Sequence, residues 1–145
     1  MSGIVVGIDG SHNAARALEW AMAEAALRKA HLTVLAVHAV PASYWTGKPA
    51  LLPGDEGRVG EVREAAESAV AAATAELGDG KPESVTVTAV DGFPAQELIK
   101  ASKDADLLVV GSRGGGGFAV LVLGSVTSQV VHHAACPVVV VPAGE

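Results

Sequence analysis

The stretch LLVVGSRG, residues 107–114, is separated by nine residues from Gly124 and Ser125. An apolar run that leads into glycines and then into a helix-like stretch, residues 125–134, is typical of a buried strand, its loop and the start of a helix. Glycines let backbone amides approach an anion closely, and a helix start adds unpaired N–H groups and a favourable dipole. We therefore predict a phosphate-binding loop, with Ser125 as the N-cap of the helix. The alternative is a flexible glycine-rich connection.

Outward from this stretch, strand-like and helix-like runs alternate along the whole chain. Strands are predicted at residues 4–8, 32–40, 85–90, 107–110 and 137–141, and helices at residues 11–29, 58–77, 94–103 and 125–134. This alternation predicts an α/β fold: an open, five-stranded parallel sheet with helices on both faces, Rossmann-like in arrangement. Ligands of such sheets bind at the carboxyl ends of the strands, where the winding direction switches.

Composition limits the classes of function. The 145 residues suit one domain, and a net charge of −6 argues against nucleic-acid binding through a basic face. The single cysteine, Cys136, excludes an internal disulfide and suits a reducing compartment. The chain start does not resemble a signal peptide, and no apolar run approaches the ~20 residues that span a bilayer. We expect a cytoplasmic protein without a membrane partner.

Two common nucleotide motifs are excluded. A Walker A loop needs Gly-Lys-Ser/Thr, which does not occur, and the dinucleotide pattern lacks its acidic residue about 20 positions later. No Asp or Glu lies between Leu107 and Gly144, so the phosphate side lacks a carboxylate to activate water or hold Mg²⁺. Asp9 is the nearest candidate. We expect nucleotide binding with at most slow hydrolysis, no catalytic residue and no metal site.

The pattern G-x2-G-x9-G-[ST] is filled here by Gly111, Gly114, Gly124 and Ser125. It resembles the nucleotide-binding signature of the ATP-binding universal stress proteins. The opening VGIDGS, residues 6–11, and the closing CPVVVV, residues 136–141, are also similar to that family's first and last strands. The resemblance implies one universal stress protein domain over residues 1–145 with a fold like that of the adenine nucleotide alpha hydrolases. It also implies ATP as the ligand, with or without Mg²⁺, and cyclic AMP as the alternative.

The resemblance implies a set of nucleotide-binding residues at strand ends and at the start of the last helix: Gly7, Asp9, Ala39, Gly111, Ser112, Arg113, Gly114, Gly115, Gly116, Gly117, Gly124, Ser125, Val126 and Thr127. Asp9 would lie by the ribose or adenine, and Ala39 would offer backbone hydrogen bonds to adenine. Residues 111–114 would wrap ribose and phosphate, and residues 125–127 would give amides and hydroxyls to the phosphates. The glycines at 115–117 depart from the family, which usually has side chains there. From the residues alone, the alternative role of Asp9 is a turn residue or a helix-start acceptor, and the alternative role of Arg113 is a solvated loop residue.

Three functions remain open. The first is a regulatory protein of the stress response that holds ATP as a ligand. The second is a slow ATPase that uses Asp9 through a metal. The third is a cyclic-AMP receptor or an interaction module without a ligand. We also predict a homodimer through the last strand, since residues 137–141 are apolar and expected at a sheet edge. The alternative is that residues 41–57 or the C-terminal tail of the same chain cover that edge.

Overall fold

Five short strands rich in β-branched residues form one parallel sheet in the computed structural model, which describes residues 3–8, 12–39, 46–47, 58–112 and 124–142. For residues 12–14 only the backbone is described. The strands are β1 (Ile4–Ile8), β2 (Leu32–Ala39), β3 (Val85–Gly92), β4 (Leu107–Gly111) and β5 (Val138–Val141). Their spatial order is β3-β2-β1-β4-β5, with every neighbouring pair parallel. The predicted five-stranded parallel sheet of an α/β fold is confirmed.

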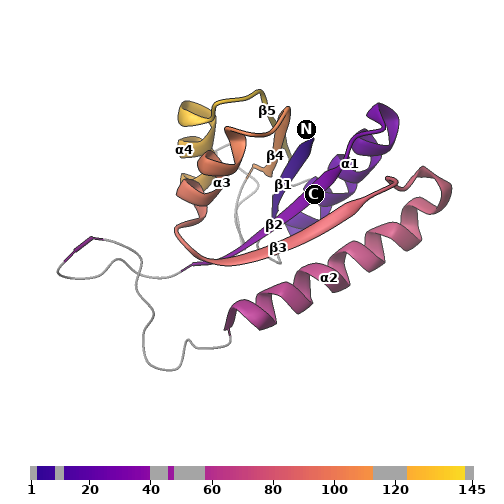
Figure 1. Cartoon of the computed structure of the whole chain (residues 1–145), viewed down its shortest axis with the longest axis horizontal. Helices are drawn as coiled ribbons and strands as arrows, with labels where there is room; N and C mark the ends of the chain where they lie inside the picture. Colours follow the sequence, from indigo (N-terminus) through magenta and orange to yellow (C-terminus); the bar gives the residue numbers. More distant parts are fainter. Residues whose placement is uncertain (1–2, 9–11, 40–45, 48–57, 113–123, 143–145) are drawn as a thin grey trace.

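Helices cover both faces of this sheet (Figure 1). They are α1 (His12–Arg28), α2 (Arg58–Leu77), α3 (Pro94–Ser102) and α4 (Ser125–His133), with a short 3-10 turn, η1 (Gly78–Gly80), after α2. The helices α1 and α2 pack on one face, and α3 and α4 on the other. Such an arrangement follows from right-handed crossovers that run first to one side of β1 and then to the other.

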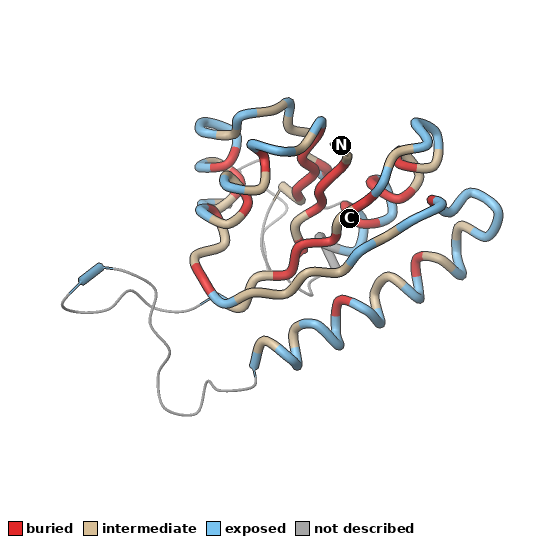
Figure 2. The backbone as a smooth tube through the Cα atoms, viewed as in Figure 1, coloured by how far each residue is buried: buried red, intermediate tan, exposed pale blue. Residues whose placement is uncertain are grey.

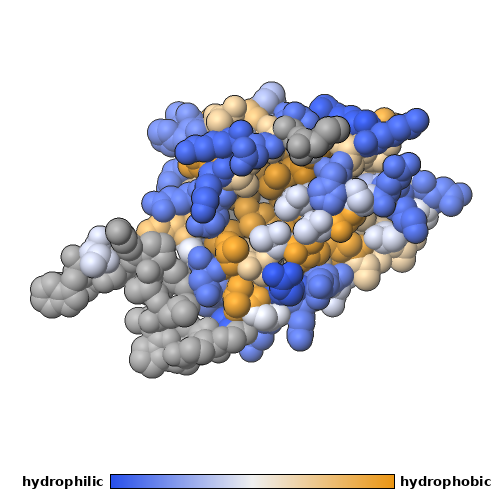
Figure 3. Space-filling model, viewed as in Figure 1, coloured by the Kyte–Doolittle hydropathy of each residue, from blue (hydrophilic) through white to orange (hydrophobic). Residues whose placement is uncertain are grey.

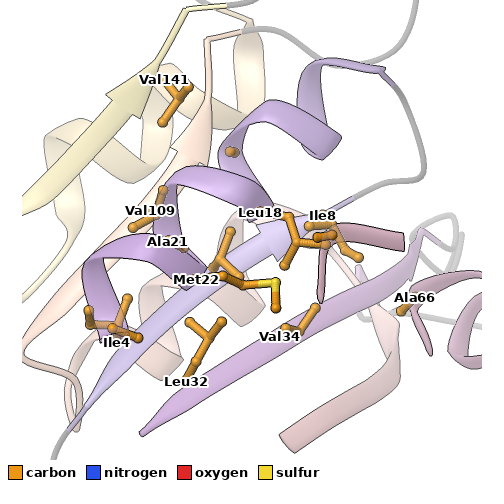
Figure 4. Packing of buried hydrophobic residues seen from close by; sticks show 14 of the residues in the cluster. Ile4, Ile8, Leu18, Ala21, Met22, Leu32, Val34, Ala66, Val109 and Val141 are labelled. Atoms are coloured by element: carbon orange, nitrogen blue, oxygen red, sulfur yellow. The ribbon is translucent and has the colours of Figure 1, made fainter. Parts of the chain in front are cut away.

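The core has two layers because successive side chains of a strand point to opposite faces. In β1, Ile4, Val6 and Ile8 face the α1–α2 layer, while Val5 faces the α3–α4 layer. Figure 4 shows the first layer, where Met22 and Leu18 of α1 lie among the strand residues. The central strands are buried on both faces (Figure 2), which explains why their sequences are apolar without alternation.

Element boundaries differ slightly from the prediction. The first helix ends at Arg28 because Lys29 takes a left-handed backbone conformation, with φ of 55°. The third strand continues beyond the predicted Val90 to Gly92, since Asp91 and Gly92 pair with His38 and Ala39 of β2. Val40, the predicted end of the second strand, lies outside the described residues.

The strand order places the topological switch between β1 and β4. From β1 the chain proceeds to β2 and β3, and then crosses back to β4 on the other side of β1. The carboxyl ends of β1 and β4 therefore meet where connections leave in opposite directions, which is where ligands of open α/β sheets bind. No helix in the described ranges is both long enough and apolar enough to cross a membrane.

Candidate functional site

The strands end at different heights along the carboxyl edge of the sheet. β1 ends at Ile8, which lies opposite Ala36, whereas β2 continues past that point to Ala39. β3 accompanies β2 to the end, with Gly92 opposite Ala39. The paired ends of β2 and β3 therefore extend beyond the end of β1 (Figure 1), on the side opposite to β4.

On the other side of β1, backbone hydrogen bonds bring the end of β4 to the start of α4. The N–H of Ser112 donates to the carbonyl of Val141 at 2.9 Å, and the N–H of Gly124 donates to the carbonyl of Ser112 at 2.9 Å. The two ends of the segment 113–123 are thus held against one another beside β5. The glycine spacing predicted from sequence therefore corresponds to a strand end and a helix start in direct contact.

A buried side chain adds to this contact. The hydroxyl of Thr127 donates to the carbonyl of Gly111 at 2.6 Å, and Thr127 is only 5% exposed. The hydroxyl hydrogen is used within the fold in this structure. Donation from this hydroxyl to a phosphate stays a prediction. The backbone N–H of Thr127 is not involved in this bond.

The first turn of α4 begins at Gly124 rather than at Ser125. Gly124 has the extended conformation of an N-cap, with φ of −65° and ψ of 161°, and its carbonyl accepts the first helical bond, from the N–H of Ser128 at 2.9 Å. The predicted N-cap role of Ser125 is therefore wrong, because Ser125 is the first residue inside the helix. No side chain in the described part of the chain caps this helix. The N–H groups of Ser125, Val126 and Thr127 precede the first helical bond, and no group in the described ranges accepts a hydrogen bond from them. Unpaired donors at a helix start favour an anion.

Gly7 has a packing reason for being glycine. A Cβ at Gly7 would lie 2.5 Å from Cδ2 of Leu98, so the buried Leu98 side chain would have to shift to admit one. Contact between Gly7 and a nucleotide stays a prediction.

Several of the predicted binding residues lie outside the described ranges, so the structure does not place them: Asp9, Arg113, Gly114, Gly115, Gly116 and Gly117. Asp9 follows the end of β1 in the sequence, and the others follow β4. Ala39 is described, and as the last residue of β2 it is exposed at the same edge of the sheet.

Two polar features of this edge were not found by sequence reasoning. His38 Nδ1 and Asp91 Oδ1 are 2.8 Å apart across the β2–β3 pair. Glu97, in the first turn of α3, lies over Gly92. Finding the His38–Asp91 pair requires the register of strands more than fifty residues apart, which no local pattern carries. The contact of Glu97 with Gly92 is local, but its position beside Ala39 depends on the same register.

The pKa of one nucleophilic side chain is shifted by its surroundings. Burial, and secondly the negative charge of Asp106, raise the pKa of the Cys136 thiol, so it is a poor nucleophile, as its sequence context suggested. Within the described ranges no group of His, Cys, Asp and Glu side chains is arranged to hold a metal ion. The edge offers backbone amides to an anion at α4 and backbone groups at the end of β2.

The model of the universal stress protein family matches residues 1–142. Two proteins of Mycobacterium tuberculosis are similar to the chain: universal stress protein Rv2623, 40% identical over 147 residues, and universal stress protein Rv2005c, 37% identical over 141 residues. Each alignment covers 96% of this chain and 47% of the relative, so the chain spans about half the length of these relatives. A solved structure of a universal stress protein in complex with cAMP has a TM-score of 0.69 at 26% identity, and covers 99% of this chain and 98% of that one. On the family match and these identities, this chain belongs to the universal stress protein family.

Proposed function

We propose that the protein binds ATP at the carboxyl edge of the sheet and acts as a regulatory protein of the stress response. The observation that carries this proposal is the start of α4, where the N–H groups of Ser125, Val126 and Thr127 lie free of side-chain caps beside the end of β4. A helix start of this kind favours phosphate through its dipole and its unpaired donors. The cyclic-AMP complex of a related universal stress protein supports an adenine nucleotide as the ligand.

The spacing of the strands suits a nucleotide laid across the edge. β2 and β4 are separated by β1, so their ends lie two strand spacings apart, about 10 Å. This distance lets the base reach Ala39 at the end of β2 while the phosphates reach α4. In this pose Asp9 would lie by the ribose or adenine, and residues 111–114 would wrap ribose and phosphate, as the family resemblance implies. Mg²⁺ would be held through the phosphates, because residues 107–144 contain no carboxylate.

The proposal is tested by removing one amide from the helix start. Ser125 occupies the first helical position, where proline is tolerated, and ψ of 161° at Gly124 suits a residue that precedes proline. Pro94 already fills the first turn of α3 in this fold. Ser125→Pro removes the N–H, whereas the matched variant Ser125→Ala removes only the hydroxyl.

We expect Ser125→Pro to weaken ATP binding by about ten-fold or more in calorimetry, since a hydrogen bond to a charged group is worth about 1.5–3 kcal/mol. Ser125→Ala should retain most of the affinity. Equal ATP affinity in the wild-type protein and the Ser125→Pro variant would contradict the site. A competition experiment between ATP and cyclic AMP distinguishes the proposed ATP-binding regulatory protein from a cyclic-AMP receptor.

We further propose that turnover is slow, because the phosphate side offers neither a carboxylate nor an activated thiol. Typical enzymes turn over at about 1–10³ per second. We expect phosphate release from ATP to fall below that range. A rate within it that is lost in Asp9→Ala would favour the ATPase instead.

We also propose that the chain forms a homodimer through β5. The strand lies at one edge of the sheet, and its residues Val138, Val139 and Val140 are only half-buried. The opposite edge differs, since Arg63 Nη1 donates to the carbonyl of Val87 in β3 at 2.9 Å. Arg63 belongs to α2, and its guanidinium places a positive charge beside the edge strand β3, which discourages pairing with another chain. β5 carries no such charge and is therefore the better edge for two-fold pairing.

A further inference from the structure

Glu97 presents a carboxylate at the end of β3. It lies in the first turn of α3, and a Cβ at Gly92 would be 3.1 Å from both Cγ and Oε2 of Glu97. Glycine at position 92 therefore lets the carboxylate lie directly over the end of the strand. Glu97 is partly buried, and no described side chain or backbone group forms a hydrogen bond or ion pair with its carboxylate.

This carboxylate is on the same face of the sheet as the Cβ of Ala39. Val37 and Val90 pack in the α3–α4 layer. Ala39 and Gly92 each follow two residues later in their strands, so they face the same side of the sheet. Because Gly92 is the register partner of Ala39, Glu97 lies about one strand spacing, ~5 Å, from the exposed end of β2.

Asp91, the other described acid at the ends of β2 and β3, is already paired. Asp91 points to the opposite face of the β2–β3 pair, where His38 Nδ1 lies 2.8 Å from its Oδ1. Figure 3 shows hydrophilic residues around an apolar centre on the face of the molecule seen in this view. Glu97 is thus the acceptor at the end of β2 and β3 whose carboxylate is left without a described partner.

We propose that Glu97 determines base specificity by accepting a hydrogen bond from the 6-amino group of adenine. The inference rests on the proposed nucleotide function. With the phosphates at α4, the six-membered ring of a purine points away from them, toward β3, because the ribose is attached to the five-membered ring. An ionised carboxylate only accepts hydrogen bonds. A 6-amino group donates to it, whereas a 6-oxo group faces it as a second acceptor and is repelled.

The test compares ATP with inosine triphosphate, which differs by a 6-oxygen in place of the 6-amino group. Affinities of the full chain are measured by calorimetry for the wild type and for Glu97→Gln. The matched control is Glu83→Gln, which removes the same charge from an exposed residue. Glu83 lies just before β3, at the amino ends of the strands rather than at their carboxyl ends. A second variant, Gly92→Ala, keeps the carboxylate but displaces it.

We expect the wild type to prefer ATP, and Glu97→Gln to reduce the ATP/ITP affinity ratio by about ten-fold, because the new amide donates to a 6-oxygen. Gly92→Ala should reduce the ratio in the same direction, and Glu83→Gln should leave it unchanged. A general effect of charge on the phosphates alters both affinities equally and so leaves the ratio unchanged.

An unchanged ratio in Glu97→Gln, or a wild type that binds GTP more tightly than ATP, would overturn the role of Glu97. If ATP still binds through Ser125 in that case, only this inference fails. A wild-type protein that binds neither ATP nor ITP removes the proposed function as well.

Discussion

Thr127 and Gly111 are joined by a hydrogen bond of 2.6 Å from the threonine hydroxyl to the glycine carbonyl. The bond links the first turn of α4 to the last residue of β4, and its donor is 5% exposed. It orients the helix start toward the carboxyl edge without covering the amides of that turn. The position of the candidate anion site therefore depends on a side chain that points into the fold rather than toward the ligand.

Replacing Thr127 by Val should destabilise the protein by about 1–2 kcal/mol, because the isosteric side chain leaves the Gly111 carbonyl without its partner. Nucleotide affinity should fall several-fold as the helix start loosens. Chemical denaturation and calorimetry measure the two effects. Thr127→Ser keeps the hydroxyl and should restore much of both.

The matched control is Thr74→Val. Thr74 donates to the carbonyl of Val70 within α2, away from the candidate site. Its loss should leave nucleotide affinity unchanged. Equal losses of affinity in the two valine variants would show that Thr127 has no particular role in positioning the site.

Gly7→Ala should cost about 1–3 kcal/mol, because the added Cβ meets Cδ2 of Leu98 at 2.5 Å and the buried Leu98 side chain must shift. Thermal or denaturant unfolding measures the loss. Combining Gly7→Ala with Leu98→Ala should give a smaller loss than the sum of the single variants, since the smaller side chain relieves the overlap. Strict additivity would argue against this contact as the cause.

Gly60→Ala is the control for glycine replacement as such. Gly60 lies exposed in α2, and nothing lies within 4 Å of a Cβ there. Alanine should stabilise the helix by about 0.5–1 kcal/mol. The two Gly→Ala changes are therefore expected to have opposite signs.

Ser102→Ala should destabilise the protein by about 1 kcal/mol. The Ser102 hydroxyl, 1% exposed, donates to the carbonyl of Ile99 and accepts from the N–H of Ala135 at 2.9 Å. Its removal detaches the end of α3 from the segment between α4 and β5. Ser68→Ala, at an exposed position of α2, should be close to neutral by the same denaturation measurement.

The proposed dimer is tested by Val140→Pro. The carbonyls of Pro137 and Val141 accept from β4, so strand alternation directs the backbone groups of Val140 away from β4, to the open edge. Proline there removes an outward N–H without removing a bond to β4, and edge strands tolerate it. We expect the variant to sediment as a monomer, while Val140→Ala, which keeps the N–H, remains dimeric.

Wild-type protein that sediments as a monomer at tens of micromolar concentration, where a standard-sized interface should hold, would rule out the dimer. A Val140→Pro variant that stays dimeric would place the interface elsewhere than β5.

Local pattern was sufficient for the strands and helices. The run Ile4–Ile8 has no polar alternation because β1 is buried on both faces, and this property is visible in the sequence itself. The start of α4 was misplaced by one residue, since serine is a common N-cap but Gly124 provides the first accepting carbonyl here.

The sequence by itself determined the α/β class, the order of elements along the chain and the glycine-rich connection between β4 and α4, because these depend on periodicity, turn residues and short-range spacing. Only the tertiary structure decided that β1 lies between β2 and β4, that Thr127 bonds to Gly111, and that Glu97 lies over Gly92 beside Ala39. Strand order and register arise from contacts between segments far apart in the chain. Those contacts are selected by how all the buried faces pack together, which no local stretch encodes.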